Sequence, residues 1–301
     1  MQDIDYSKIS ITAKLVAHLR QFSDIPFAQD VAEHIKAEEA IQEIARRLNT
    51  ENQSPEERKE MEAEGKVSAP LLEARYKSIV EVIHQTGIKQ VLELASGFSL
   101  RGLAMAQDTG ISYVESDLPD LNTEKTKLIS TLREKYQLED RGNHHVATAN
   151  ALARTELEAA AEPLDRDKPI LIVNEGLIPY LSEAEIENLT ENVRYLLGKF
   201  NGGSWITPDF TTRQTADDVS EHRKRFRDAV SDTTARQLHG AAFASEEAID
   251  EFISDHGFSA VHSYQTDLVK DLVSVGRLGL DSKVVERLKP HMRIWLMSPV
   301  A

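Results

Sequence analysis

The sequence predicts an α/β protein with one seven-stranded, mostly parallel sheet and helices on both faces. From residue 90 onward, short apolar runs bounded by turn residues alternate with stretches of helical periodicity. This alternation is typical of parallel strands joined by helical crossovers. The runs fall at residues 91–95, 111–116, 144–148, 170–174, 204–207, 258–264 and 293–297. A chain of 301 residues is long enough for one large domain with additions or for two small domains.

The first 70 residues form a predicted N-terminal helical extension, and residues 71–301 form the main domain. We expect helices at 11–22, 30–48 and 55–63. Ser54, Pro55 and Glu57 indicate the start of the third helix, because they form a capping box with proline at the first helical position. A further helix is expected at 71–85, where apolar residues recur on one face and Gly87 follows.

Helices are also expected between the strands, at 100–107, 123–136, 183–199 and 246–256. Ser182 and Glu185 form a second capping box at the start of the third of these. Residues 210–244 are polar, have a helical pattern and interrupt the alternation after the fifth strand. They are either a helical insertion that covers a pocket or a solvated surface helix.

Composition excludes several classes of function. The formal net charge is −15, and the acidic residues are spread along the chain. A nucleic-acid partner or an anionic membrane is therefore not expected, because both need clustered basic residues. The absence of cysteine excludes a disulfide framework, a thiolate zinc site and a cysteine nucleophile. No secretory signal or run of 18 apolar residues occurs, so we expect a soluble cytoplasmic protein.

The segment VLELASGFSLRGLA (91–104) predicts a ligand-binding turn after the first strand. Its loop would lie at the carboxyl edge of the sheet, where open α/β sheets bind ligands. Gly97 permits close backbone approach, and Glu93 can organise the loop or accept hydrogen bonds from an ammonium group. The spaced glycines of a dinucleotide site and the phosphate-binding loop are both missing, which argues against NAD. Alternatively, the turn only connects a strand to a helix.

Two acidic residues, Glu115 and Asp117, end the second strand. A carboxylate at this tip can accept hydrogen bonds from both ribose hydroxyls of a nucleoside. The alternative role for Asp117 is the N-cap of the following helix. The two residues share one side of the strand, so geometry alone does not choose between them.

Five segments together resemble the leucine carboxyl methyltransferase family, in its bacterial branch similar to polyketide O-methyltransferases. They are SITAKLVAHLR with DIPFAQDVA, EARY before the first strand, LASGFSLRGLA, YVESDLP with Lys125 or Lys127 downstream, and VNEGLIPYLSEAEI. The resemblance implies a seven-stranded class I methyltransferase sheet of the Rossmann-like type. It also implies S-adenosylmethionine as cofactor and methyl donor.

The resemblance further implies roles for individual residues. Arg75 is similar to the arginine that binds the methionine carboxylate, Gly97 to the glycine under the cofactor, and Asp117 to the ribose ligand. Glu175 would meet the amino-acid end of the cofactor, and Asn150 would lie near adenine. The full expected cofactor site comprises Arg75, Glu93, Ala95, Gly97, Arg101, Glu115, Asp117, Asn150 and Glu175.

The loop also departs from the family pattern. Relatives usually have glycine at the position of Ala95 and Asp-Thr near Ser99 and Leu100. Alanine is tolerated there if its φ is negative. Arg101 matches an arginine of the family, although an arginine that begins a helix can equally be a surface residue.

No catalytic residue is assigned and no metal is expected. A sulfonium methyl group is already electrophilic, so the protein mainly has to align an acceptor and exclude water. A carboxylate acceptor needs no base, whereas a hydroxyl would gain from one. His144, His145, His222 and His239 are the candidates, and each is more often an ordinary histidine. The expected function is O-methylation of a small-molecule carboxylate or hydroxyl. The alternatives are a protein C-terminal carboxyl methyltransferase and a non-catalytic module that binds S-adenosylmethionine.

Overall fold

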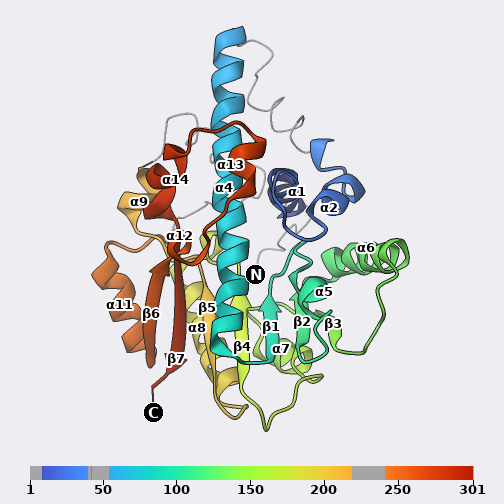
Figure 1. The fold of residues 1–301 in the computed structure, drawn as a ribbon. Coiled ribbons are helices and arrows are strands. Elements are labelled where there is room, and N and C mark those ends of the chain that lie inside the picture. The colour runs from blue at the N-terminus through green and yellow to red at the C-terminus, as the bar shows by residue number, and fades with distance from the viewer. Residues whose placement is uncertain (1–8, 40–41, 43–53, 219–240, 301) are drawn as a thin grey trace.

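The computed structural model describes residues 9–39, 42, 54–218 and 241–300 (Figure 1). A single sheet with the strand order β3-β2-β1-β4-β5-β7-β6 forms its centre. The first five strands pair in parallel, and β7 runs antiparallel to both β5 and β6. The strands are β1 (Gln90–Leu94), β2 (Ser112–Asp117), β3 (His144–Thr148), β4 (Ile170–Asn174), β5 (Gly203–Thr207), β6 (Phe258–Tyr264) and β7 (Arg293–Pro299). The predicted fold class is confirmed, and every expected strand is present with ends that differ by at most two residues.

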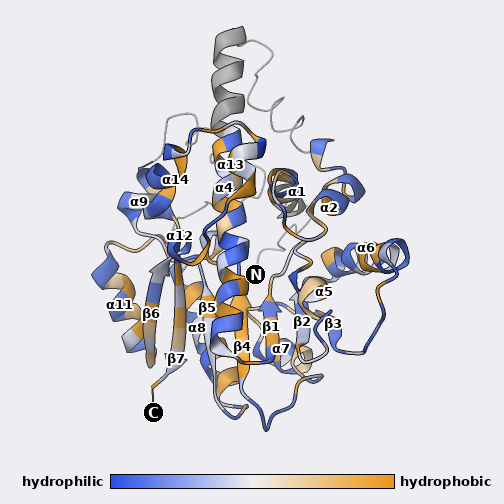
Figure 2. Cartoon of the chain, in the orientation of Figure 1, coloured by the Kyte–Doolittle hydropathy of each residue, from blue (hydrophilic) through white to orange (hydrophobic). Residues whose placement is uncertain are grey.

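Helices cover both faces of the sheet, because the strands carry apolar side chains on both faces. On one face lie α4 (Pro55–Thr86), α5 (Arg101–Met105) and α6 (Pro119–Tyr136). On the other lie α7 (Arg154–Ala160), α8 (Glu183–Leu197) and α11 (Glu246–Asp255). The central strands β1 and β4 are buried along their whole length and are largely apolar (Figure 2). The predicted capping box at Ser182 and Glu185 is present at the start of α8.

The helices expected at 55–63 and 71–85 are wrong as two separate helices, because α4 runs unbroken from 55 to 86. Proline normally breaks a helix interior, since it removes a backbone hydrogen bond. Pro70 is nevertheless accommodated inside α4. Ala69 and Leu72 pack with Leu19 of α1 (Ile9–Arg20), and Leu71 packs beside the C-terminal helices. Tertiary packing on two sides therefore holds the helix together at residue 70.

The helix expected at 30–48 is interrupted by a turn at residues 35 and 36, after which residues 37–39 and 42 are helical again. Helix α2 (Ala28–His34) ends where Lys36 adopts a left-handed conformation with φ 52°. The turn buries both Ile35 and Ala37, which a continuing helix would place on different faces. Most of residues 40–48 lie outside the described part of the chain.

The two ends of the segment expected as an insertion at 210–244 meet in an isolated bridge between Thr212 and Phe243, outside the sheet. Arg213 donates a backbone hydrogen bond to Phe243 (2.8 Å), and Phe243 donates one to Thr211 (3.0 Å). A short helix, α9 (Arg213–Asp217), follows Thr212. Residues 219–240 lie outside the described residues, so the predicted helix there is not tested.

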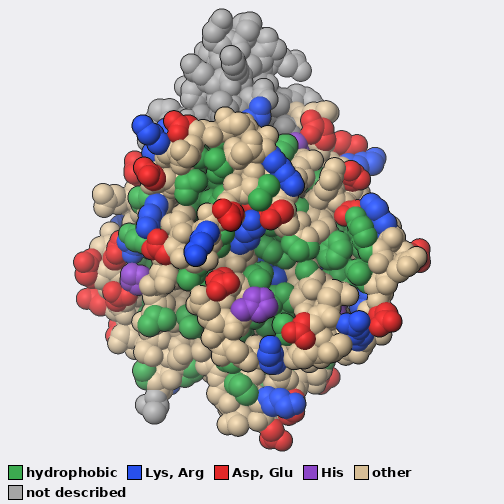
Figure 3. Space-filling view, in the orientation of Figure 1, with side chains coloured by type: hydrophobic (Ala, Val, Ile, Leu, Met, Phe, Trp, Pro, Cys, Tyr) green, Lys and Arg blue, Asp and Glu red, His purple; other side chains and the backbone are tan. Residues whose placement is uncertain are grey.

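The C-terminal part adds short helices around the antiparallel strands. They are α12 (Gln265–Leu268), α13 (Val273–Arg277), α14 (Lys283–Leu288) and η4 (Lys289–His291), whereas η3 (Ile178–Tyr180) lies between β4 and α8. On the face shown in Figure 3, acidic and basic side chains are interspersed. None of the described helices is long and apolar enough to cross a bilayer.

Candidate active site

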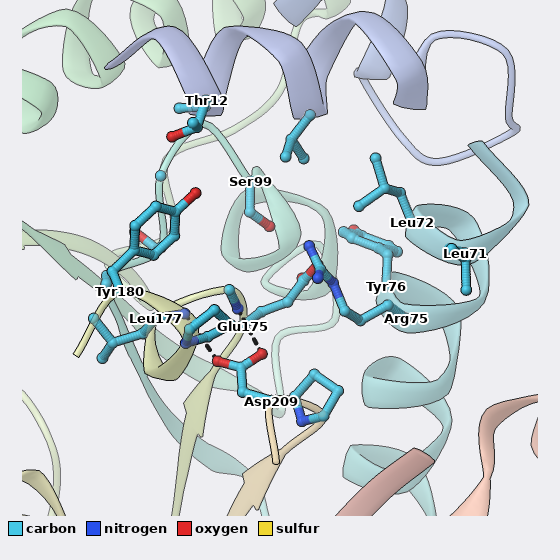
Figure 4. Close-up of a pocket in the computed structure, with 18 of the residues that line it drawn as sticks. Thr12, Leu71, Leu72, Arg75, Tyr76, Ser99, Glu175, Leu177, Tyr180 and Asp209 are labelled. Carbon is cyan, nitrogen blue, oxygen red and sulfur yellow. Dashed lines mark hydrogen bonds and ion pairs between the residues drawn. The ribbon is translucent and has the colours of Figure 1, made fainter. Parts of the chain in front are cut away.

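A cavity of about 590 Å³ opens at the edge of the sheet where the parallel strands end. Helix α1 passes over it, and α4 forms one wall (Figure 4). The lining includes all the expected cofactor residues except Arg101 and Glu115. The fold thus brings together expected site residues that lie far apart in the sequence. Arg75 and Glu175 are 100 positions apart, and the distance between Arg75 Nε and Glu175 Oε1 is 2.8 Å.

The side chain of Asp117 stabilises the turn after β1 through a backbone hydrogen bond. Its carboxylate accepts hydrogen bonds from the backbone N–H of Gly97 and of Leu118, both at 2.7 Å. Burial raises the pKa of Asp117, and the two N–H groups oppose that rise. Helix α6 begins with Leu118 as its N-cap residue, and no side chain caps it. The alternative role of Asp117 as helix N-cap is therefore not what the structure shows.

Ala95 follows β1 with a φ of 49°, so the condition under which alanine would be tolerated there, a negative φ, is not met. This conformation places the Cβ of an L-residue close to its carbonyl oxygen. Gly97, two residues later, also has a positive φ of 53°. The turn thus needs two left-handed residues and has a glycine at only one of them.

Glu175, just after β4, is the centre of a cluster of three arginines. It pairs with Arg75 of α4, with Arg20 of α1 and with Arg101 of α5. Burial alone would raise the pKa of Glu175, but the three guanidinium groups outweigh it and hold the pKa well below its usual range. Glu93 pairs with Arg101 as well, so three positive charges face two negative ones.

The arginines differ in how far they reach the cavity. The side chain of Arg75 is 24% exposed, whereas Arg101 is fully buried between Glu93 and Glu175. Arg20 lines the cavity, and its buried Nε has no hydrogen-bond partner among the described residues. Both Arg20 and Arg75 can therefore offer N–H groups to an anion inside the cavity.

Glu115 lies behind the cavity lining in a buried network. Its carboxylate contacts Nζ of Lys125 at 3.1 Å and Nε2 of His144 at 2.8 Å. Burial would raise the pKa of Glu115, but Lys125 and His144 together lower it to about 2. Lys125 also donates to Ser96 Oγ at 2.8 Å and so connects this network to the turn after β1.

Two further expected residues, Glu93 and Asn150, already have partners within the protein. Glu93 lines the cavity, but one of its oxygens pairs with Arg101 and the other accepts from Tyr113 at 2.7 Å. Asn150 also lines the cavity, and its Oδ1 accepts from the backbone N–H of Leu152 at 3.0 Å. A second lone pair on that oxygen is available to a ligand.

Asp209 and Tyr180 line the cavity and, like Arg20, were not among the site residues expected from the sequence. Asp209, two residues after β5, accepts hydrogen bonds from the backbone N–H groups of 176, 177 and 178. Tyr180 lies after β4, next to residues 176–178, and its ring points into the cavity towards Thr12 (Figure 4). Burial raises the pKa of both side chains. Asp209 could have been found by the argument that identified Asp117, since it too is a carboxylate at a strand end.

The histidines contribute no metal site among the described residues, where no group of three potential ligands occurs. His144 is committed to Glu115, and neither His144 nor His145 lines the cavity. His222 and His239 lie outside the described part of the chain.

The strand order, the reversed β7 and a ligand cavity at the carboxyl edge define the class I methyltransferase fold. The sequence profile of the leucine carboxyl methyltransferase family matches residues 10–194, which is more than half of the chain. The chain belongs to the leucine carboxyl methyltransferase family.

Individual proteins are more distantly similar. A protein of Mycobacteroides abscessus, named "Putative S-adenosyl-L-methionine-dependent methyltransferase", is 24% identical over 209 residues. The match covers 68% of this chain and 64% of that protein, so the chain spans less than two thirds of the relative's length. The structure of an O-methyltransferase family protein from Burkholderia thailandensis has a TM-score of 0.49 at 12% identity. The structural match covers 90% of this chain and 72% of the Burkholderia thailandensis chain.

Proposed function

We propose that the protein is an S-adenosylmethionine-dependent O-methyltransferase that acts on a carboxylate or hydroxyl of a small molecule. The observation that carries the proposal is the cavity at the carboxyl edge of β1, β2 and β4. At one end of it, the Asp117 carboxylate braces the Gly97 turn, and at the other, Arg20 and Arg75 surround Glu175. Family membership supports the same reaction class.

The residues of the cavity fit the cofactor. The buried Nε of Arg20 has no partner among the described residues, and a bound carboxylate would satisfy it. Arg75 would share that carboxylate, while Glu175 would accept from the ammonium group and Asp117 from the ribose hydroxyls. Asn150 would face adenine. A nucleoside without phosphates suits this acidic strand edge, where a phosphate would be repelled.

When bound, the cofactor supplies an electrophilic methyl group on a sulfonium. The chain has to orient an acceptor oxygen against it and exclude water. Tyr180, Phe210 and Leu71 also line the cavity, and Figure 4 shows Tyr180 and Leu71 on opposite sides of the Arg75 and Glu175 pair. Helix α1 passes over the cavity, which favours a small acceptor over the terminus of another protein chain.

Calorimetric titration with S-adenosylmethionine tests the cofactor assignment. The native protein should bind it, and Asp117→Asn should weaken binding by about ten- to a hundredfold, because an amide offers a single acceptor oxygen and no charge. Glu115→Gln should weaken it less, since Glu115 faces Lys125 and His144.

Circular dichroism must first show that both variants are folded. If Glu115→Gln proved the more damaging change, Glu115 would be the ribose ligand. If the native protein failed to bind S-adenosylmethionine, the proposed function would be lost. Tight binding without methylation of any carboxylate or hydroxyl acceptor would instead indicate a non-catalytic module.

A further inference from the structure

A lysine on α6, Lys125, is buried behind the cavity and has no direct part in the proposed reaction. Its side chain is fully buried, and it is not among the residues that line the cavity. An ammonium group loses its hydration when it is buried, so a lysine is almost never fully buried without partners. The partners of Lys125 therefore indicate what it does.

The ammonium group of Lys125 connects two parts of the molecule. Its Nζ atom is 3.1 Å from Oε1 of Glu115 on β2, and it donates a hydrogen bond of 2.8 Å to Oγ of Ser96. Nε2 of His144, on β3, is 2.8 Å from the other oxygen of Glu115. Lys125 is thus anchored on two strands of the sheet, and one of its hydrogen bonds reaches the turn after β1.

Ser96 lies between the two left-handed residues of that turn. Ala95 and Gly97 have φ values of 49° and 53°, and the Cβ of Ala95 makes its conformation strained. A strained segment keeps its conformation only where the surrounding structure fixes it. Ser96 donates a backbone hydrogen bond to Ser116, and its own backbone oxygen accepts one from Ser99, both at 3.0 Å. The contact with Lys125 fixes the side chain of Ser96 as well.

Lys125 contacts the turn from the side that faces away from the cavity. Ser96 lines the cavity, whereas Lys125 and Glu115 do not. Asp117 also fixes the turn through the N–H of Gly97, but the proposed cofactor would use the same carboxylate. The contact between Lys125 and Ser96 is therefore the side-chain contact to this turn that the proposed cofactor leaves unchanged.

From these contacts we infer that Lys125 is a positioning residue for the cofactor. By fixing Ser96, it keeps the turn at 95–97 in its strained conformation before the cofactor binds. Binding then does not have to order the turn, and this preorganisation lowers the dissociation constant. The inference rests on the proposed methyltransferase function, and it assigns a role in that function to a residue that does not touch the ligand.

A double-mutant cycle, measured by calorimetric titration with S-adenosylhomocysteine, tests the inference. Lys125→Met and Ser96→Ala should each weaken binding by about tenfold, because each removes the same hydrogen bond. The double variant should bind no more weakly than either single variant, since one contact can be lost only once. Circular dichroism first establishes that each variant is folded.

Lys127→Met is the matched control. Lys127 lies two residues further along α6 and is exposed. The control removes the same side chain and the same charge at the surface, so it should bind S-adenosylhomocysteine as the native protein does. A purely structural role of Lys125 would lower the free energy of unfolding in urea but leave the affinity of the folded variant unchanged.

Hydrogen exchange gives a second readout, which needs no ligand. The backbone N–H groups of Ser96 and Gly97 both donate hydrogen bonds, so they should be protected in the native protein. They should exchange about tenfold faster in Lys125→Met and in Ser96→Ala, because the turn is then less firmly fixed. In Lys127→Met they should exchange at the native rate.

Native affinity in either folded single variant would overturn the inference. So would losses that add up to about a hundredfold in the double variant, an equal loss in Lys127→Met, or exchange that stays at the native rate. If Lys125→Met failed to fold, Ser96→Ala would still decide the matter, because it keeps the pair of Lys125 and Glu115. If the native protein failed to bind S-adenosylhomocysteine, the proposed function would fall, and this inference with it. Native binding with unaltered variants would overturn this inference alone.

Discussion

Ala95 holds a left-handed conformation that is strained for any residue with a Cβ. We expect Ala95→Gly to raise the free energy of unfolding by about 0.5 kcal/mol. The relief of roughly 1–2 kcal/mol of strain exceeds the added flexibility of glycine in the unfolded chain. Urea denaturation measures the difference.

The control for this change is Ala106→Gly, because Ala106 is buried and has an ordinary φ of −71°. There the same substitution only loses a methyl group and adds flexibility, so it should destabilise. A loss of stability in both variants would mean that residue 95 is not strained.

Glu115 gives the stability of the protein a dependence on acid. Its pKa is about 2 in the folded protein and 4.5 ordinarily, so between these values the unfolded chain binds the proton more readily. Stability due to Glu115 is therefore present above about pH 4.5 and is lost as the pH falls towards 2.

We expect native protein to be more stable than Glu115→Gln at pH 6, since the variant leaves Lys125 buried without its counter-ion. The gap should narrow as the pH falls from 5 to 2. Denaturant titrations across this range measure the difference in free energy of unfolding between the two proteins. The raised pKa values of Asp117 and Asp209 do not change this difference, because both proteins contain these residues. A gap that stays constant would contradict the assigned pKa.

Strand alternation alone could not separate the roles of Glu115 and Asp117. Alternation along β2 correctly puts both on one side of the strand. What distinguishes them is the partner that tertiary structure brings to each: Lys125 and His144 for Glu115, and two backbone N–H groups for Asp117. A sequence pattern contains no information on which oxygens are already occupied.

At the scale of elements, Gly102 lets α5 approach β2 closely. A Cβ added there would lie 2.7 Å from both Glu115 Cγ and Tyr113 Cδ1. Gly102→Ala should therefore lower the free energy of unfolding by about 1–3 kcal/mol, the usual cost of overpacking a core. Thermal and urea denaturation measure it.

Gly276→Ala in α13 is the contrasting variant, because no atom lies within 4 Å of the added methyl. Alanine favours a helix over glycine by about 0.8–1 kcal/mol, so this variant should be slightly more stable. Equal effects of the two alanines would show that the close approach at Gly102 costs nothing.

Strands were predicted more accurately than helices, and the reason is physical. Strands β1, β2, β4 and β5 are largely buried, so their short apolar runs stand out between turn residues. The extent of α4 depends instead on packing by α1 and by helices almost 200 residues later, which overrides the local effect of Pro70. Arg20 escaped assignment for the same reason: its contact with Glu175 spans 155 residues.

For the whole molecule, ligand binding should appear as thermal stabilisation. S-adenosylhomocysteine at a hundred times its dissociation constant should add about 2.7 kcal/mol and raise Tm by several degrees. NAD should leave Tm unchanged, because the turn at Gly97 lacks the further glycines that a pyrophosphate requires. Stabilisation by NAD alone would overturn the cofactor assignment.

Two backbone hydrogen bonds join residues 211–213 to Phe243. We expect the stretch between them to tolerate replacement, because its two ends are held together. Lengthening a closed loop costs little, about 0.6 kcal/mol for each doubling. The two hydrogen bonds close this loop at its base, whereas β5 and β7 hold their register through their own pairing, from Trp205 with Met297 to Thr207 with Trp295. A chimaera that carries a different stretch between these residues should therefore still fold, with the sheet unchanged.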